Sequence, residues 1–213
     1  MSPNSIPPNW PRSLLYLTHN VWAPDIPAVQ RTPYLHHTVS EAAEDDGIPV
    51  KKVKVHTGPC PDVEIRAITE KSHPAFGQNG LYAKKRISPF SFLLDYRGTI
   101  QCSSNVSLQS DYTLLFDGDL TIDAQNSGSE ARFINDFHNI SSRPNAAFDT
   151  YRDAITGEVR VGVWALNQWI GPGQEILVPY GGEYWSKEGK EWDDAWDEGE
   201  EDWVMENGED NLD

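Results

Sequence analysis

The stretch Ala131-Arg-Phe-Ile-Asn135 and the later stretch Gly173-Gln-Glu-Ile-Leu-Val-Pro-Tyr-Gly181 decide how this sequence is interpreted. Each stretch joins apolar side chains, which suit a protein core, to a polar side chain at or near its end. Asn135 taken alone is compatible with two roles, a turn residue or a hydrogen-bonding amide. Tyr180 taken alone is compatible with packing at a strand end or with catalysis. The segments around the two stretches are needed to choose between these roles.

Short runs rich in β-branched and aromatic residues surround the two stretches, with turn residues between them. Residues 146–170 hold two alternating runs on either side of Thr156-Gly157, the pattern of a long β-hairpin. Alternate positions from Val159 to Ala165 are apolar and fall on one face. We therefore predict a mostly β domain of the α+β class, with several small sheets and few short helices. The other predicted strands lie at 63–68, 81–83, 92–96, 112–116, 120–123 and 176–178.

Three parts are expected along the chain: an arm at 1–62, a domain at 63–185 and a tail at 186–213. The arm holds apolar patches between prolines and shows no persistent period, so it is expected to be largely irregular. Its stretch Lys51-Lys-Val-Lys-Val55 has two interpretations, a targeting signal or the solvated face of a strand, and the second is favoured. The arm side chains expected to pack on the domain are Trp10, Leu14, Leu15 and Trp22.

The formal net charge of -16 is concentrated in the tail. Residues 186–213 contain thirteen acidic residues and two lysines, so they contribute -11. This charge argues against direct binding to nucleic acid or to an anionic membrane, and it favours a basic partner. The tail is expected to be solvated. Its residues Trp192, Trp196 and Trp203 nevertheless have a helical spacing that would suit packing on the domain.

Several other classes of site find no support in the sequence. Cys60 and Cys102 cannot build a zinc cluster alone or a disulfide framework, and they indicate a reducing compartment. The six histidines lack the paired spacing of a metal site, and neither a Gly-x-Ser-x-Gly elbow nor a phosphate loop is present. The chain also lacks an apolar run of about 20 residues and a secretory start. We therefore expect a soluble intracellular protein without a bound metal.

Several motifs, in their order and spacing, resemble the SET family of protein lysine methyltransferases. The strongest match is the stretch that ends at Asn135, with Pro144-Asn145 as its closing pair. The Gly-x-Glu-(four residues)-Tyr-Gly ending at Gly181 is the next strongest. The weaker matches are His73-Pro-Ala-Phe-Gly-Gln-Asn-Gly-Leu-Tyr-Ala83, Leu94-Asp-Tyr-Arg-Gly98, Asp111-Tyr112 and Leu120-Thr-Ile-Asp-Ala124. The resemblance implies a knot-like active site that methyl donor and lysine enter from opposite faces.

The sequence departs from the family pattern in two ways. The family motif usually continues His-Ser-Cys, whereas Asp136-Phe-His138 follows Asn135 here. The cysteines of the family's zinc sites are also absent, so the chain resembles small SET proteins without zinc-binding flanks, including fungal ones. The resemblance therefore implies that another element closes the cofactor and substrate sites, and the Trp-rich tail is the expected element.

The resemblance implies a lysine channel lined by aromatic side chains. Tyr180 would align the attacking amine, and Tyr112 is the second catalytic candidate. Tyr96 and Tyr112 would line the channel, although Tyr96 is equally compatible with packing at a strand end with its hydroxyl in water. Val178 would leave room for the addition of more than one methyl group.

The resemblance also implies S-adenosylmethionine as the methyl donor. Asn135 would bind its amino-acid end, and the backbone N–H and C=O of Asp136 would pair with its adenine edge. Arg132 and Phe133 are included among the expected donor-binding residues, and their side chains are also expected to support the fold. The further expected donor contacts are Gln78, Asn79, Gly80, Leu81, Tyr180 and Trp185.

The favoured function is methyl transfer to a lysine of a protein, with a histone tail as the preferred substrate. One alternative is a catalytically inactive SET-like module that binds histones or other basic proteins, and another is a methyltransferase of a non-histone protein. The presence of both Asn135 and Tyr180 favours the enzyme. The nucleus is the expected compartment, with the cytoplasm as the alternative, and a homodimer is compatible with the sequence.

Overall fold

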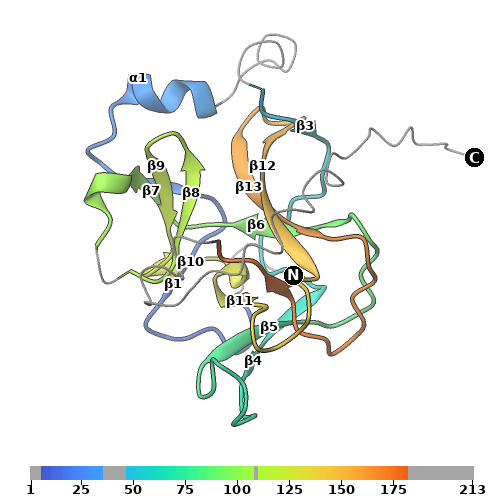
Figure 1. The fold of residues 1–213 in the computed structure, drawn as a ribbon. Coiled ribbons are helices and arrows are strands. Elements are labelled where there is room, and N and C mark those ends of the chain that lie inside the picture. Colours follow the sequence, from blue (N-terminus) through green and yellow to red (C-terminus); the bar gives the residue numbers. More distant parts are fainter. Residues whose placement is uncertain (1–5, 36–46, 108–109, 182–213) are drawn as a thin grey trace, which may run out of the picture. The chain divides into compact units, whose positions relative to one another are not determined.

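The computed structural model describes residues 6–35, 47–107 and 110–181, which form many short strands and few helices (Figure 1). The chain divides into two compact units, Met1–Pro179 and Tyr180–Asp213. Only Tyr180 and Gly181 of the second unit are described, so the fold below is that of the first unit. The predicted fold class, mostly β with several small sheets, is confirmed.

The predicted long hairpin forms the middle of a four-stranded sheet. Its two strands pair antiparallel from Ala146 opposite Ala165 to Arg152 opposite Val159. Alternate side chains from Val159 to Ala165 are at most 2% exposed, because this strand lies between two neighbours and packs on the core. The sheet has the order β3 (Val50–Lys51), β12 (Ala146–Asp153), β13 (Val159–Ala165) and β6 (Phe92–Tyr96).

A second four-stranded sheet supplies the other large part of the core. Ile100 and Ile122 face each other in register across two antiparallel strands, and both side chains are almost fully buried. The predicted strands at 92–96 and 120–123 have the predicted bounds, whereas the strand predicted at 112–116 begins and ends one residue later. The order of this sheet is β2 (Val21–Trp22), β7 (Thr99–Cys102), β9 (Leu120–Asp123) and β8 (Thr113–Asp117).

Three two-stranded pairs and several single-turn helices complete the described part of the first unit. The antiparallel pair is β4 (Val63–Ala67) with β5 (Asn79–Ala83). The parallel pairs are β1 (Leu15–Tyr16) with β10 (Ser127–Gly128), and β11 (Asn135–Asp136) with β14 (Leu177–Val178). The helices are α1 (Ala28–Arg31) and the 3₁₀ helices η1 (Thr32–Tyr34), η2 (Ser103–Asn105) and η3 (Glu130–Phe133). Among the described residues, no helix has the length and apolar character needed to cross a bilayer.

The N-terminal arm contributes more to the sheets than its irregular sequence predicts. Strands β1, β2 and β3 belong to it, and they pair in parallel with β10, β7 and β12. Trp10 is buried as expected, and its ring meets the ring of Phe133 edge-on at 5.5 Å between centroids. The expected packing of Leu15 is wrong: its side chain is 63% exposed, and the residue is held through its backbone in β1. Of the lysine-rich stretch, only Lys51 lies in a strand, at the end of β3.

The buried carboxylate of Glu130 fastens the arm to η3. Its Oε1 accepts a hydrogen bond from the backbone N–H of Cys60 at 2.8 Å, and its Oε2 accepts one from the Tyr16 hydroxyl at 3.2 Å. Burial raises the pKa of Glu130 above its usual value of 4.5, because the charged form loses hydration that these hydrogen bonds only partly replace. Ionisation of Glu130 therefore opposes folding while its hydrogen bonds support it.

Replacing Glu130 with glutamine is expected to change the pH dependence of the free energy of unfolding. A carboxyl whose pKa is higher in the folded state contributes stability fully below its unfolded pKa, near 4.5, and loses that contribution as the pH rises through the folded pKa. As the pH rises from 4.5 towards neutrality, the wild-type protein should therefore lose stability relative to Glu130→Gln. Urea denaturation at a series of pH values measures this difference. The exposed-site control Glu70→Gln should follow the wild-type curve, and parallel curves for wild type and Glu130→Gln would contradict the prediction.

Candidate active site

Strands β11 and β14 bring together the two stretches on which the sequence interpretation rests. They pair in parallel, with Asn135 opposite Leu177 and Asp136 opposite Val178. The backbone N–H of Phe137 extends this pairing by donating to the Val178 carbonyl at 3.1 Å. Asn135, the amide expected to bind the methyl donor, thus pairs with Leu177, which lies three residues before Tyr180 in the sequence.

Asn145 locks this pairing from the side of β14. Its carboxamide donates to the Glu175 carbonyl at 2.7 Å and accepts from the Leu177 N–H at 2.9 Å, while its own N–H donates to the Leu177 carbonyl at 3.1 Å. The residue is 3% exposed, so these backbone groups would otherwise be buried without partners. The closing Pro-Asn of the motif therefore has a structural role that the sequence analysis did not assign.

The Glu175 carboxylate is the hub of the candidate site. Its Oε1 accepts from the Asn135 Nδ2 at 2.8 Å, and its Oε2 accepts from the Tyr82 hydroxyl at 3.2 Å and lies 3.1 Å from the His73 Nε2. The side chains of His73 and Glu175 are each 9% exposed. Burial, followed by the nearby Glu175 charge, raises the pKa of Tyr82 to about 12, so Tyr82 remains a hydrogen-bond donor at neutral pH. The sequence analysis gave no role to His73 or Tyr82, although both lie in its Gly-rich motif.

Because Gly80 has no side chain, the Glu175 carboxylate can lie directly beside β5. A Cβ at this position in β5 would lie 2.6 Å from the Glu175 Oε1 and 2.9 Å from the Tyr82 ring. The sequence analysis expected Gly80 to contact the methyl donor. The structure adds a second requirement for glycine, the close approach of the Glu175 carboxylate. Any side chain here would displace the carboxylate that orients Asn135.

The hydrogen bonds of Asn135 fix the direction of its carboxamide. Its Nδ2 donates to Glu175 and more weakly to the Asn79 carbonyl at 3.4 Å, so its Oδ1 points elsewhere. Within residues 6–35, 47–107 and 110–181, this Oδ1 accepts no hydrogen bond. In the parallel pair with β14, the Asn135 and Phe137 backbone groups face Val178, so those of Asp136 face the other way. The site thus offers the Asn135 amide oxygen as a hydrogen-bond acceptor.

The side chains of Arg132 and Phe133 contact the protein itself. The Nε of Arg132 donates to the Ala124 carbonyl at 2.9 Å, and its guanidinium lies 3.9 Å from the centroid of the Tyr112 ring. The Phe133 ring packs against Trp10 of the arm. Both residues are buried. These contacts agree with the expectation that both side chains support the fold.

Tyr96 and Tyr112 are joined by a hydrogen bond. Tyr96 is 6% exposed, and its hydroxyl donates to the Tyr112 carbonyl at 2.8 Å. Burial raises the pKa of the Tyr96 hydroxyl, which therefore stays protonated. The alternative in which this hydroxyl extends into water is wrong. Tyr112 is half-buried, with its ring against the Arg132 guanidinium.

The other predicted site residues fall in three places. Gln78 precedes β5, and Asn79, Gly80 and Leu81 lie within it. Val178 ends β14 and is fully buried. Tyr180 opens the second unit two residues later, and Trp185 lies outside the described residues, as do the other tail tryptophans.

Gly80→Ala is expected to destabilise the protein by about 1–3 kcal/mol, because the added Cβ must displace a carboxylate held by several hydrogen bonds. Gly58→Ala is the matched control, since its Cβ would meet nothing within 4 Å and its φ is not in the left-handed region. It should change the stability by at most about 0.5 kcal/mol. Urea denaturation measures both variants. Equal stability of Gly80→Ala and Gly58→Ala would contradict the tight packing of Glu175 on β5.

Comparison with solved structures relates the fold to known proteins. ATXR5, solved in complex with mono-methylated histone H3.1, has a TM-score of 0.54 at 18% identity, covering 80% of this chain and 82% of that chain. KRYPTONITE, solved in complex with mCHH DNA, an H3(1–15) peptide and SAH, has a TM-score of 0.55 at 16% identity, covering 79% of this chain and 41% of that chain. At these identities the likeness establishes the fold alone. No curated protein matches the sequence.

The sequence itself matches one family model, described as the SET domain, over residues 78–181. This range begins at β5, which carries Gly80, and ends just after Tyr180. It therefore contains β11, β14 and the Glu175 hub. Over residues 78–181 this chain therefore matches the SET domain in sequence, and its fold resembles that of the two solved structures.

Proposed function

We propose that this protein transfers a methyl group from S-adenosylmethionine to the side-chain amine of a lysine in a basic protein, with a histone tail as the substrate. The observation that carries the proposal is the orientation of Asn135 by the Glu175 side chain, which is only 9% exposed, beside the strand that runs to Tyr180. The SET-domain match over the same residues supports it.

The groups of the candidate site fit the chemistry of the proposed donor. The Asn135 Oδ1 is an acceptor suited to the ammonium of the donor's amino-acid end. The Asp136 backbone faces away from β14 and is suited to the donor-acceptor edge of adenine, and the backbone of β5 from Asn79 to Leu81 would line the same site. When bound, S-adenosylmethionine supplies a methyl group on a positively charged sulfur, which a nucleophile can displace.

The acceptor lysine must reach the site as a neutral amine, because its protonated form has no lone pair. A free lysine has a pKa of about 10.4, and an apolar environment lowers it. Glu175 accepts hydrogen bonds from groups around it and is suited to orienting them rather than to removing a proton. We infer that desolvation supplies the neutral amine and that the Tyr180 hydroxyl aligns it for in-line attack.

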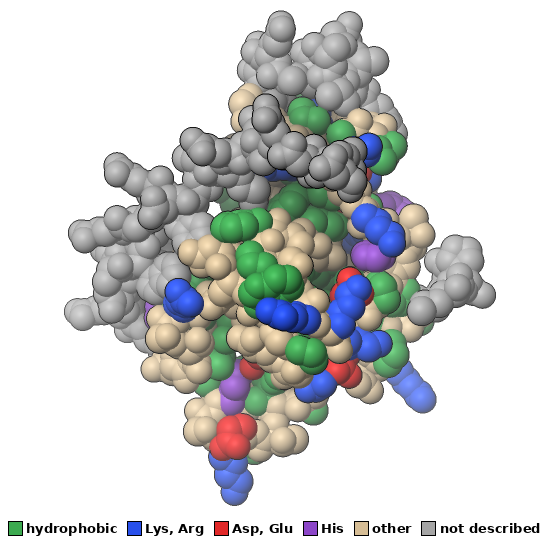
Figure 2. Space-filling view, turned by 90° about the vertical axis from the view of Figure 1, so that its right-hand side faces the viewer, with side chains coloured by type: hydrophobic (Ala, Val, Ile, Leu, Met, Phe, Trp, Pro, Cys, Tyr) green, Lys and Arg blue, Asp and Glu red, His purple; other side chains and the backbone are tan. Residues whose placement is uncertain are grey.

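The proposed basic substrate matches the charge of the segments outside the described residues. The described residues contain 15 Lys and Arg and 15 Asp and Glu, so the net charge of -16 comes from residues 41–46 and 182–213. On the face in Figure 2, basic side chains are prominent and acidic ones are scattered, rather than forming a continuous acidic surface. We infer that the acidic segments attract a basic peptide and that the neutral SET domain selects its lysine.

The histone proposal also draws on the proteins that share the fold. ATXR5 was solved with histone H3.1, and KRYPTONITE with a histone H3 peptide and SAH. A histone substrate would place this protein in the nucleus. The small Val178 side chain at the end of β14 supports the addition of more than one methyl group to the same lysine.

Two substitutions test the proposal in the full-length protein with labelled S-adenosylmethionine and purified core histones. Tyr180→Phe should lower the rate of transfer at least about 100-fold and leave donor binding nearly unchanged, because only the aligning hydroxyl is lost. Asn135→Ala should weaken donor binding by about 1–3 kcal/mol, or roughly 5- to 150-fold in Kd, measured by calorimetry. Mass spectrometry of the product counts the methyl groups.

Matched controls separate these effects from a general loss of structure. Tyr34→Phe removes a hydroxyl that bonds Asp117 at 2.7 Å, and Asn105→Ala removes an exposed amide that bonds Asp25 at 2.7 Å. Both should retain transfer and donor binding. Donor and histone binding without transfer by the wild-type protein would favour the inactive binding module, and transfer only to cytosolic proteins would favour a non-histone substrate.

A further inference from the structure

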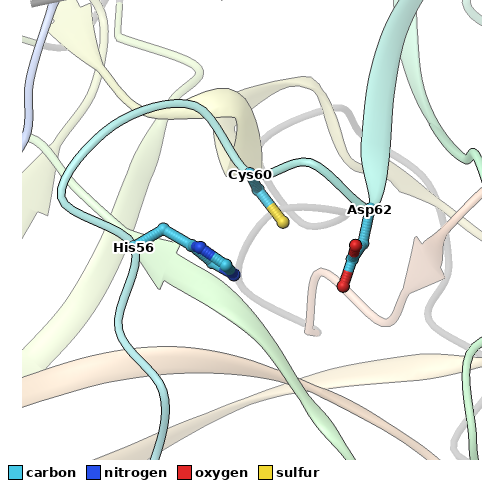
Figure 3. Close-up of side chains that lie close together, drawn as sticks. All are labelled: His56, Cys60 and Asp62. Carbon is cyan, nitrogen blue, oxygen red and sulfur yellow. The ribbon is translucent and has the colours of Figure 1, made fainter. Parts of the chain in front are cut away.

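A cluster of side chains that can act as metal ligands lies outside the proposed methyl-transfer site, in the loop that joins the arm to β4. The loop contains His56, Cys60 and Asp62, whose side chains turn into the same space (Figure 3). One imidazole nitrogen, the thiol sulfur and one carboxylate oxygen all lie within 4.8 Å of one another. Cys60 is buried and the other two residues are half-buried. The sequence analysis dismissed a metal site because it searched for paired histidines or several cysteines.

We propose that His56, Cys60 and Asp62 form a binding site for a divalent transition-metal ion of the zinc class, with water as the fourth ligand. Zinc bonds to sulfur at about 2.3 Å and to nitrogen or oxygen at about 2.0–2.2 Å, so ligand atoms in a tetrahedral site lie about 3.5 Å apart. Small side-chain rotations would bring the three atoms to that separation. One sulfur, one nitrogen and one oxygen ligand favour zinc over calcium or magnesium, which prefer oxygen alone.

Hydrogen bonds of the backbone hold the loop in place and leave the three candidate ligand atoms out of the contact. The backbone N–H of Cys60 donates to the buried Glu130, and the backbone carbonyl of His56 accepts from the Arg97 guanidinium at 2.9 Å. Arg97 is itself paired with the buried Asp95 at 3.2 Å. Because the backbone is anchored at both ligand positions, an ion would bind a largely preformed loop and lose less entropy on ordering it.

The Cys60 thiol is suited to a metal and poorly suited to solution chemistry. Cys60 is only 5% exposed, so its sulfur is shielded from reagents in solution. A divalent ion supplies the charge that stabilises the thiolate and displaces its proton.

Two competing contacts must be given up, and both are weak. The Lys85 ammonium pairs with Asp62 at 2.8 Å, but its side chain is 64% exposed, and such surface pairs contribute about 0–1 kcal/mol. The thiol also donates to the Leu93 carbonyl over a long 3.6 Å contact. His56 in addition lines a cavity of about 100 Å³, which Cys60 and Asp62 do not line.

Untagged full-length protein, stripped with a chelator and titrated with Co²⁺ and then Zn²⁺, tests the proposal. One equivalent of Co²⁺ should produce an ultraviolet sulfur-to-cobalt charge-transfer band, and Zn²⁺ should abolish it. The band requires a thiolate ligand, so it separates this site from metal held by the acidic segments. Cys60→Ser should lose the band, and Cys102→Ser should keep it.

Two further variants keep the test decisive if Cys60→Ser does not fold. His56→Asn and Asp62→Asn, at half-buried positions, should each weaken Zn²⁺ binding at least about tenfold. Lys85→Ala removes the competitor of the metal and should leave binding unchanged or tighter. Absence of the charge-transfer band in the wild-type protein, its persistence in Cys60→Ser, or unchanged affinity in both His56→Asn and Asp62→Asn would overturn the proposal. None of these results depends on methyl transfer.

Discussion

The parallel pairing of β11 with β14 is the constraint on which the candidate site depends. Strands this short make few ladder hydrogen bonds of their own, so the pairing needs support from side chains. Asn145 supplies it by bonding the backbone on either side of Ile176, and the buried Glu175 carboxylate adds a bond to the Asn135 amide. A buried backbone group left without a partner costs about 1–3 kcal/mol, so these contacts hold the site together as a unit.

The sequence predicted those parts of the fold that depend on local patterns. The hairpin formed by β12 and β13 was predictable because alternating apolar residues lie on either side of a Thr-Gly turn. The site stretches were predictable because the motifs ending at Asn135 and Gly181 are specific in combination. The parallel pairing of β1, β2 and β3 was not predictable, because strands of two residues leave no period in the sequence.

Long-range polar contacts also leave no local signal. Glu175 meets His73 across 102 positions of the chain, and Cys60 meets Glu130 across 70. Neither partner carries a pattern that identifies the other. Charge, in contrast, can be located from the sequence: the net charge of -16 comes from residues 41–46 and 182–213, and the described residues are electrically balanced. The acidic segments that would attract a basic substrate are thus different parts of the chain from the domain that would select its lysine.

The most direct test of the central claim, that Glu175 orients Asn135 for donor binding, is calorimetric titration of Glu175→Gln with S-adenosylmethionine. Glutamine keeps the shape of the side chain but has one acceptor oxygen in place of two. It therefore cannot accept hydrogen bonds from both Asn135 and Tyr82 in the positions that the two carboxylate oxygens occupy. Donor affinity should fall at least about tenfold, while the exposed-surface control Glu70→Gln binds as the wild type does. Unchanged donor affinity in a folded Glu175→Gln protein would contradict the claim.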